Sequence, residues 1–271
     1  MMRALWSAAS GMIAQQTNVD TISNNIANVN TTGYKTEKTE FKSLLYQNLQ
    51  ARTTTANGAN KPIPAQVGLG TRVASNTSMF TQGAMLASES DTAFAIDGEG
   101  FFAVRGADGN TYYTRNGNFT WSIGNDGVIL TNSDGYPVLD SRGNMIRKPD
   151  GVAAEKVSVT SQGQFYYRDA QGNPVDMNQS IGLFQFNNPA GLEKMSGSLL
   201  AVTDASGVAI NEATAVNIKP SKVLAGYLEG SNVQVADEMV NLIVAQRAYE
   251  MNSKAIQAAD DMLGQANQLK R

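Results

Sequence analysis

Both ends of the chain carry a heptad pattern that its middle lacks. At the N-terminal end, apolar side chains recur every seven residues, and a second set follows three residues after each of them. This is the a/d pattern of a helix that buries one stripe against other helices. It predicts a helix that ends near Gly33, with this glycine as a left-handed C-terminal stop. The predicted assembly positions are Leu5, Met12, Val19, Ile22, Ile26 and Val29.

The surface of this predicted helix is poor in charge. Between Arg3 and Lys35 the one charged residue is Asp20, and the other polar residues are Asn, Thr, Ser and Gln. Helices that face water normally carry Glu and Lys, whereas Asn and Thr are weak helix formers. We therefore expect a helix that is marginal alone and is completed by other subunits. The alternative is an ordinary amphipathic helix packed on its own domain.

The C-terminal end repeats the arrangement. Gly230 breaks the chain, and Ser231 with Gln234 forms an S-x-x-Q signature, which predicts a capping box at a helix start. Large side chains then recur every seven residues, with smaller ones three residues after them, so we expect a helix over residues 231–269. Its predicted assembly positions are Val235, Leu242, Ala245, Tyr249, Asn252, Ile256, Ala259 and Leu263.

Between these ends the pattern becomes that of β-structure. Turn signals such as Asp-Gly and Asn-Gly recur at spacings of about 8 to 12 residues and separate short apolar runs, for example residues 101–104, 112–114 and 128–130. The predicted fold class is α+β. A discontinuous α-helical coiled-coil domain comes from residues 1–35 and 231–271, and a central all-β domain spans residues 67–230.

Residues 36–66 have a different character. Phe41 and Leu49 suggest a short amphipathic piece, and residues 51–64 are polar, with no core-forming side chain before Ile63. This composition predicts a linker or extended segment that neighbouring subunits order. A tolerated surface loop is the alternative.

Side chains for most catalytic and metal chemistry are missing. The chain has no Cys and no His, which excludes disulfides, thiolate nucleophiles, imidazole acid–base catalysis and Cys/His zinc sites. It also lacks the G-x-S-x-G, P-loop, S-x-x-K and G-x-G-x-x-G motifs. Asp97 and Glu99 flank Gly98 in a predicted hairpin turn, which is a turn signal rather than an acid pair. We therefore expect no enzyme activity, no cofactor and no metal, and we name no catalytic residue.

The net charge and hydropathy of the chain limit the kinds of partner that we expect. The net charge of −3 gives no basic excess, which argues against a nucleic-acid partner. No apolar run approaches the roughly 18 residues that span a bilayer, so we expect no membrane insertion. Ser10, Gly11 and Gln15 interrupt the apolar stretch at the N-terminal end, so we expect no cleaved secretory signal.

Three stretches, in collinear order, resemble the axial proteins of the bacterial flagellar rod and hook. Residues 23–35 resemble the N-terminal signature of this family, and residues 240–256 resemble its C-terminal domain. Residues 95–102 and 113–119 look like its shared β domain. The residues that match the N-terminal motif are Asn24, Asn25, Ala27, Asn28, Thr31, Gly33 and Tyr34.

The resemblance implies a structural subunit of the distal part of the basal-body rod, which polymerises into a rigid hollow helical tube. The tube would transmit torque and enclose the export channel, with the terminal helices inside, the β domain outside and residues 36–66 bracing neighbouring subunits. The implied partners are further copies of the chain, adjacent rod and hook subunits, the flagellar type III export apparatus, and envelope components such as bushing rings and peptidoglycan. The implied location is the extracytoplasmic basal body, reached without a cleaved signal peptide.

Other functions remain open from the sequence. Within the same family, the chain is alternatively a proximal rod or hook-type axial subunit. In a different class of protein, it is a cell-wall-associated hydrolase, which needs two spaced carboxylates in a cleft. A glycan-binding protein is the third alternative, and such a protein would work without the terminal helices.

Overall fold

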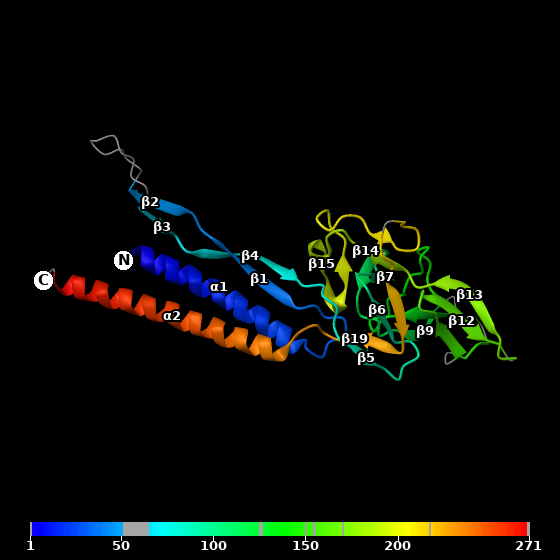
Figure 1. The fold of residues 1–271 in the computed structure, drawn as a ribbon. Helices are drawn as coiled ribbons and strands as arrows, with labels where there is room; N and C mark the ends of the chain where they lie inside the picture. Colours follow the sequence, from blue (N-terminus) through cyan, green and yellow to red (C-terminus); the bar gives the residue numbers. More distant parts are fainter. Residues whose placement is uncertain are drawn as a thin grey trace. The chain divides into compact units, whose positions relative to one another are not determined.

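The computed structural model describes residues 2–50, 65–124, 127–149, 151–153, 156–169, 171–216 and 218–269. It contains two long helices and many short strands (Figure 1). The predicted α+β class is therefore confirmed. The chain divides into two compact units. The helical unit comprises Met1–Ala27, Glu37–Ser78 and Gln234–Arg271, and the β unit comprises Asn28–Thr36 and Met79–Val233.

The two helices of the helical unit pack against each other in opposite directions. The helices are α1 (Met2–Ala27) and α2 (Val235–Gln268), which have 26 and 34 residues (Figure 1). Their direction follows from two neighbouring pairs, since Asn25 lies beside Glu238 and Gly11 lies beside Asn252. Both heptad regions of the sequence therefore form helices, and the two helices belong to one unit.

A two-stranded antiparallel ribbon completes the helical unit. Backbone hydrogen bonds from Leu44 to Gly70 (2.9 Å) and from Leu69 to Leu45 (3.2 Å) join its two strand pairs end to end. The pair formed by residues 37–43 and 71–78 contacts α1. The strand pairs are β1 (Glu37–Ser43) with β4 (Thr71–Ser78), and β2 (Tyr46–Gln50) with β3 (Ala65–Gly68). The linker predicted over residues 36–66 thus includes β1, β2 and the first two residues of β3, while its polar part, residues 51–64, lies outside the described residues.

The β unit is built from antiparallel sheets. Its largest sheet has the order β15-β16-β8-β7-β14-β17. These strands are β7 (Phe101–Arg105), β8 (Thr111–Thr114), β14 (Leu183–Gln185), β15 (Glu193–Lys194), β16 (Leu200–Ala201) and β17 (Ile210–Asn211). The smaller sheets hold β9 (Thr120–Gly124) with β10 (Gly127–Thr131), and β11 (Val157–Val159), β12 (Gln164–Arg168) and β13 (Pro174–Ser180). The apolar runs predicted as strands are all strands.

Two strand pairs join the beginning of the β unit to its end. They are β5 (Met85–Ala87) with β19 (Tyr227–Glu229), and β6 (Phe94–Asp97) with β18 (Lys222–Ala225) (Figure 1). Because β18 and β19 come last in the β unit, its sheet structure closes with residues that lie far along the chain. This closure brings the segment just before α2 next to the segment that follows β4.

The core of the β unit forms on both faces of the largest sheet. Phe101 and Phe102 are consecutive on β7 and fully buried, and they belong to two different clusters because successive strand residues point to opposite faces. Phe102 packs edge-on against Phe119 at 5.2 Å between ring centroids, and Phe101 packs against Phe186 at 5.6 Å. This packing gives the β unit its own hydrophobic core.

Candidate functional site

The predicted assembly positions of the N-terminal helix differ in burial. Ile22 is buried in the helical unit, whereas Leu5, Met12, Val19 and Ile26 are half-buried. Val29 lies beyond α1, because the helix ends at Ala27. The predicted end near Gly33 was therefore too late. After the helix, Thr31 bonds back to Asn28 through both its backbone N–H and its hydroxyl, at 3.1 Å each, and such local bonds compete with helix continuation.

On α2 the small side chains of the heptad pattern are buried and several large ones are not. Ala245 and Ala259 are 2% and 1% exposed. Leu242, Asn252 and Ile256 are half-buried, and Val235, Tyr249 and Leu263 are exposed. The predicted seam of large and small residues is thus divided between the interior of the helical unit and its surface.

Further apolar side chains lie on both helices outside the predicted heptad positions. Trp6 is 70% exposed and Ile243 is 56% exposed. Such side chains are more numerous than a solvated helix pair needs, and a large exposed apolar surface marks an interaction site. We call this group the exposed apolar set: Met2, Trp6, Ile13, Met239, Val240, Ile243, Val244, Met251 and Met262.

The residues of the family motif are distributed over both units. Asn25 is buried at 1% exposure, and its amide bonds both the carbonyl (2.8 Å) and the N–H (2.9 Å) of Glu37 at the start of β1. The same Asn25 amide lies 3.4 Å from Glu238 of α2. Asn25 therefore ties α1 to the ribbon and to α2. Asn24 and Ala27 are exposed on α1, while Asn28, Thr31, Gly33 and Tyr34 lie half-buried in the β unit.

Gly33 has two structural requirements that only glycine meets. Its φ of +71° is left-handed, as predicted, although it lies in a turn beyond the end of α1 rather than at the helix terminus. A Cβ at this position would lie 2.6 Å from the backbone N of Asn116. The Gly33 N–H also donates to the carbonyl of Glu229 at 2.8 Å.

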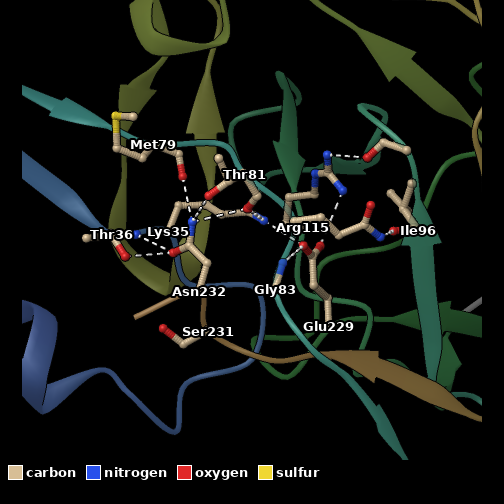
Figure 2. A network of polar contacts seen from close by, with 12 residues as sticks. Lys35, Thr36, Met79, Thr81, Gly83, Ile96, Arg115, Glu229, Ser231 and Asn232 are labelled. Carbon is tan, nitrogen blue, oxygen red and sulfur yellow. Dashed lines mark hydrogen bonds and ion pairs between the residues drawn. The ribbon is translucent and has the colours of Figure 1, made fainter. Parts of the chain in front are cut away.

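Glu229 is the centre of a buried ionic cluster in the β unit (Figure 2). Its Oε1 lies 2.5 Å from Lys35 Nζ and accepts the Gly83 N–H at 3.0 Å, and its Oε2 lies 3.3 Å from Arg115 Nη1. Arg115 also donates to the carbonyl of Gly98 at 2.7 Å and stacks over the Phe101 ring at 5.1 Å. We call Lys35, Arg115 and Glu229 the ionic cluster.

Burial dominates the electrostatics of the two cations. Desolvation lowers the pKa of Lys35 below its usual 10.5, and the attraction and hydrogen bond of Glu229 oppose this shift. Desolvation likewise lowers the pKa of Arg115, against the attraction of Glu229. Because two cations share one carboxylate, removal of Glu229 would leave two buried charges without their main partner.

Asn232 forms a second polar centre beside the ionic cluster (Figure 2). Its Oδ1 accepts the backbone N–H and the hydroxyl of Thr36, at 2.7 and 2.8 Å. Its Nδ2 donates to the carbonyls of Met79 (2.8 Å) and Thr81 (3.1 Å) and to the Thr81 hydroxyl (2.8 Å). The Asn232 side chain therefore joins three segments by hydrogen bonds: the segment before β1, the segment after β4 and the segment before α2.

These contacts correct the predicted start of α2. The helix begins at Val235 with Gln234 as its N-cap, and no side-chain cap hydrogen bond forms. The Ser231 hydroxyl instead accepts the Val233 N–H at 3.3 Å. The capping-box prediction was wrong because Ser231 and Asn232 belong to the polar structure of the β unit.

The sequence reasoning missed the ionic cluster and Asn232. Lys35 and Arg115 lie inside the stretches that resemble the flagellar family, but no periodicity connects them to Glu229. Lys35 and Glu229 are 194 residues apart. The contact follows only from the tertiary arrangement of β19 and the segment before β1.

Two features that would indicate other functions, a metal-binding group and a membrane-spanning helix, were sought in the described part of the chain. In it, no three His, Cys, Asp or Glu residues gather in a group that could hold a metal ion. Among the same residues, neither helix has the length and apolar character to cross a membrane. A helix pair with exposed apolar side chains, attached to a β unit with its own core, defines instead a structural subunit of a larger assembly.

Comparisons with known proteins agree with this class. The models described as flagella basal body rod protein, flagellar hook protein FlgE/F/G D1 domain, and flagellar basal body rod FlgEFG protein C-terminal match residues 5–35, 95–167 and 224–269. The chain belongs to the flagellar basal-body rod protein family, and several relatives that match it over nearly its whole length carry the name FlgG.

The relatives match along the whole chain. The flagellar basal-body rod protein FlgG of Borreliella burgdorferi is 43% identical and covers 100% of both chains. Those of Buchnera aphidicola subsp. Schizaphis graminum and Agrobacterium fabrum are 39% and 42% identical; they cover 99% and 96% of this chain and 100% and 97% of their own. These matches support a structural subunit of the distal rod and do not favour the alternatives from the sequence.

Proposed function

We propose that the chain polymerises through its helical unit into a rigid hollow helical tube, which transmits torque in the distal rod and encloses an export channel. The exposed apolar set on α1 and α2 is the observation that carries this proposal. Each large apolar side chain that becomes buried contributes about 1.5–3 kcal/mol, so several per subunit favour association strongly. The proposed contacts are coiled-coil-like packing of α1 and α2 against the helices of other copies.

The proposed polymer is open rather than closed. An interface that joins two different surfaces of identical subunits gives a helical filament when its rotation does not close. The exposed apolar set occupies both helices, which offers such different surfaces. In this arrangement the helical units form the inner tube and the β units form the outer wall, with residues 36–66 bracing neighbouring subunits.

The further partners and the location belong to the same proposal. Adjacent rod and hook subunits contact the ends of the polymer, and bushing rings and peptidoglycan surround its outer wall. The chain reaches this extracytoplasmic site through the flagellar type III export apparatus. Folding without any cysteine makes the subunit insensitive to the redox state of either compartment, which supports such a route.

Two matched variants test the proposal. The purified full-length protein should sediment as tubes or short rods, visible by electron microscopy. Ile243→Asp places a charge in the exposed apolar set and should keep the protein monomeric. Ile123→Asp makes the same change at an 88% exposed position of β9 in the β unit and should assemble like the wild type. Equal assembly of the two variants, or no polymer from the wild type at any concentration, would contradict the proposal.

A further inference from the structure

Asn232 lies beside three of the four places where the chain passes between the two units. The chain passes from one unit to the other after Ala27, Thr36, Ser78 and Val233. Thr36 is the last residue of the β unit before β1, Met79 is the first residue after β4, and Asn232 comes one residue before the last passage. The Asn232 side chain bonds directly to both Thr36 and Met79.

The hydrogen bonds of this side chain use both ends of its amide. The carbonyl oxygen accepts two hydrogen bonds from Thr36, and the NH₂ group donates hydrogen bonds to Met79 and Thr81. A primary amide has two donor hydrogens and two acceptor lone pairs, so this arrangement fixes its orientation. Thr36 and Met79 are also joined directly, because the Met79 N–H donates to the Thr36 carbonyl at 2.8 Å. In Asn232→Asp the side chain keeps only the bonds that it accepts from Thr36. In Asn232→Leu it keeps none of these bonds.

A single connecting segment is normally a place where a chain bends. Each residue has two soft backbone dihedrals, and hinges are a few loop or element-terminal residues that absorb large changes in them. Three segments that are bonded to one another cannot change these dihedrals independently. The amide of Asn232 therefore restricts the backbone dihedrals of each connecting segment, which could change independently without it.

We infer that Asn232 is a positioning residue that cross-ties the three connecting segments and so stiffens the passage of the chain between the helical unit and the β unit. For the polymer, the inference rests on the proposed function: a stiff passage gives a rod that resists bending. For the isolated subunit, it stands on the contacts of Asn232 alone. An ordinary turn-stabilising Asn would affect the stability of the β unit and leave the motion of the connecting segments unchanged.

The absence of cysteine makes a direct measurement possible. Spin labels at Lys38→Cys on β1 and Ala107→Cys before β8, both exposed positions, report one distance between the units. Double electron–electron resonance on the full chain should give a narrow distance distribution in the Asn232 background. Asn232→Leu should widen this distribution at least about twofold, because the three segments then move separately. Asn232→Asp should widen it less, because the Thr36 contacts remain.

A matched asparagine separates positioning from stability. Asn211 on β17 also uses both ends of its amide, donating to the Ser141 carbonyl (2.6 Å) and accepting the Ala213 N–H (2.9 Å), but it touches no connecting segment. Asn211→Leu should lower the stability of the β unit and leave the distance distribution narrow. If Asn232→Leu fails to fold, Asn232→Asp decides the inference by the same measurement. A distribution of wild-type width in a folded Asn232 variant would overturn it.

The polymer provides the second readout. Asn232→Leu subunits should still form rods, since the exposed apolar set is unchanged, but these rods should have a shorter persistence length in electron micrographs. Rods of wild-type stiffness would overturn the inference for the polymer. If the wild type forms no rods, the proposed function fails, while the distance measurement still decides the role of Asn232.

Discussion

The carboxylate of Glu229 and the ammonium group of Lys35 lie 2.5 Å apart, although 194 residues separate them in the chain. Glu229 stands at the end of β19, and Lys35 stands just before β1. The ion pair therefore joins the segment that follows α1 to the segment that precedes α2. Both side chains are buried, so loss of the Glu229 carboxylate would leave the buried charge of Lys35 without its main partner.

Replacement of Glu229 by Gln should destabilise the β unit by about 3–5 kcal/mol, because Lys35 and Arg115 then keep buried charges without a carboxylate. The measurement is urea unfolding in a Trp6→Phe background, in which Trp121 of β9 is the one remaining tryptophan and reports on the β unit. Glu250→Gln is the control, since its pair with Arg247 is exposed and contributes about 0–1 kcal/mol. Equal losses in both variants would show that the ionic cluster contributes little.

The pKa of Lys35 predicts a stability change at alkaline pH. Burial lowers this pKa in the folded state below the 10.5 of the unfolded chain. Between these two values the unfolded chain binds the extra proton, so stability rises with pH, by at most about 1.4 kcal/mol per unit. Below the folded pKa both states are protonated and the contribution is flat.

The check compares the wild type with Lys35→Met by urea unfolding from pH 7 to 10.5, in the same Trp6→Phe background. The difference in unfolding free energy should move in favour of the wild type as the pH rises, and other titrating groups largely cancel in the difference. A difference that moves against the wild type would mean that Glu229 raises the pKa of Lys35 more than burial lowers it.

Hydrogen exchange should divide the monomer into slow and fast parts. Amides of α1 and α2 should exchange rapidly at low concentration, because much of their apolar surface lacks a partner. The amides of Gly33, Thr36 and Gly230 should be protected with the β unit, since they bond to Glu229, Asn232 and Ala84. Protection of α1 equal to that of β7 in a proven monomer would refute this expectation.

The buried alanines of α2 should tolerate no added volume. Ala245→Leu places a bulky side chain at a 2% exposed position and should cost about 1–3 kcal/mol per subunit by overpacking. Polymer yield in a sedimentation assay should fall, while the β unit unfolds as in the wild type. Ala255→Leu makes the same change at an exposed position and should have a smaller effect. Normal motility of a strain with Ala245→Leu would show that assembly does not depend on the packing at this position.

Deletion of residues 52–61 tests the proposed brace. Thermal unfolding of the monomer should change little, because stability depends weakly on loop length. The polymer should curve, shorten or stop growing, as seen by electron microscopy. A Gly/Ser replacement of equal length separates the effect of the side chains from that of the length. Straight rods of normal length from both variants would mean that this segment braces nothing.

The fold could largely be predicted from the sequence, because its signals are local. Heptad spacing located α1 and α2, and turn spacing located strands such as β7, β8 and β10. The helix ends were less accurate. Gly33 and Ser231 carry residue types that are common at helix termini, yet Gly33 makes a tertiary bond to Glu229 and Ser231 makes a local bond to Val233 instead of capping the helix.

The candidate site could be predicted only in part. A heptad pattern identifies one stripe of a helix, so it found Ala245 and Ala259 but not Trp6 or Ile243. The ionic cluster and Asn232 join segments that are far apart in the chain. Pairing over such separations leaves no periodic trace in a single sequence, and only the folded arrangement brings these side chains together.

The β unit cannot be completed before its closing strands β18 and β19 are available. Their partners, β6 and β5, lie more than a hundred residues earlier in the chain, and pairing over such distances makes folding slow. The ionic cluster also depends on the pairing of β19 with β5, since Glu229 is the last residue of β19. A chain that emerges from a narrow passage with its N-terminal end first therefore cannot complete the sheet closure, the ionic cluster or the Asn232 contacts until residues 222–232 have appeared.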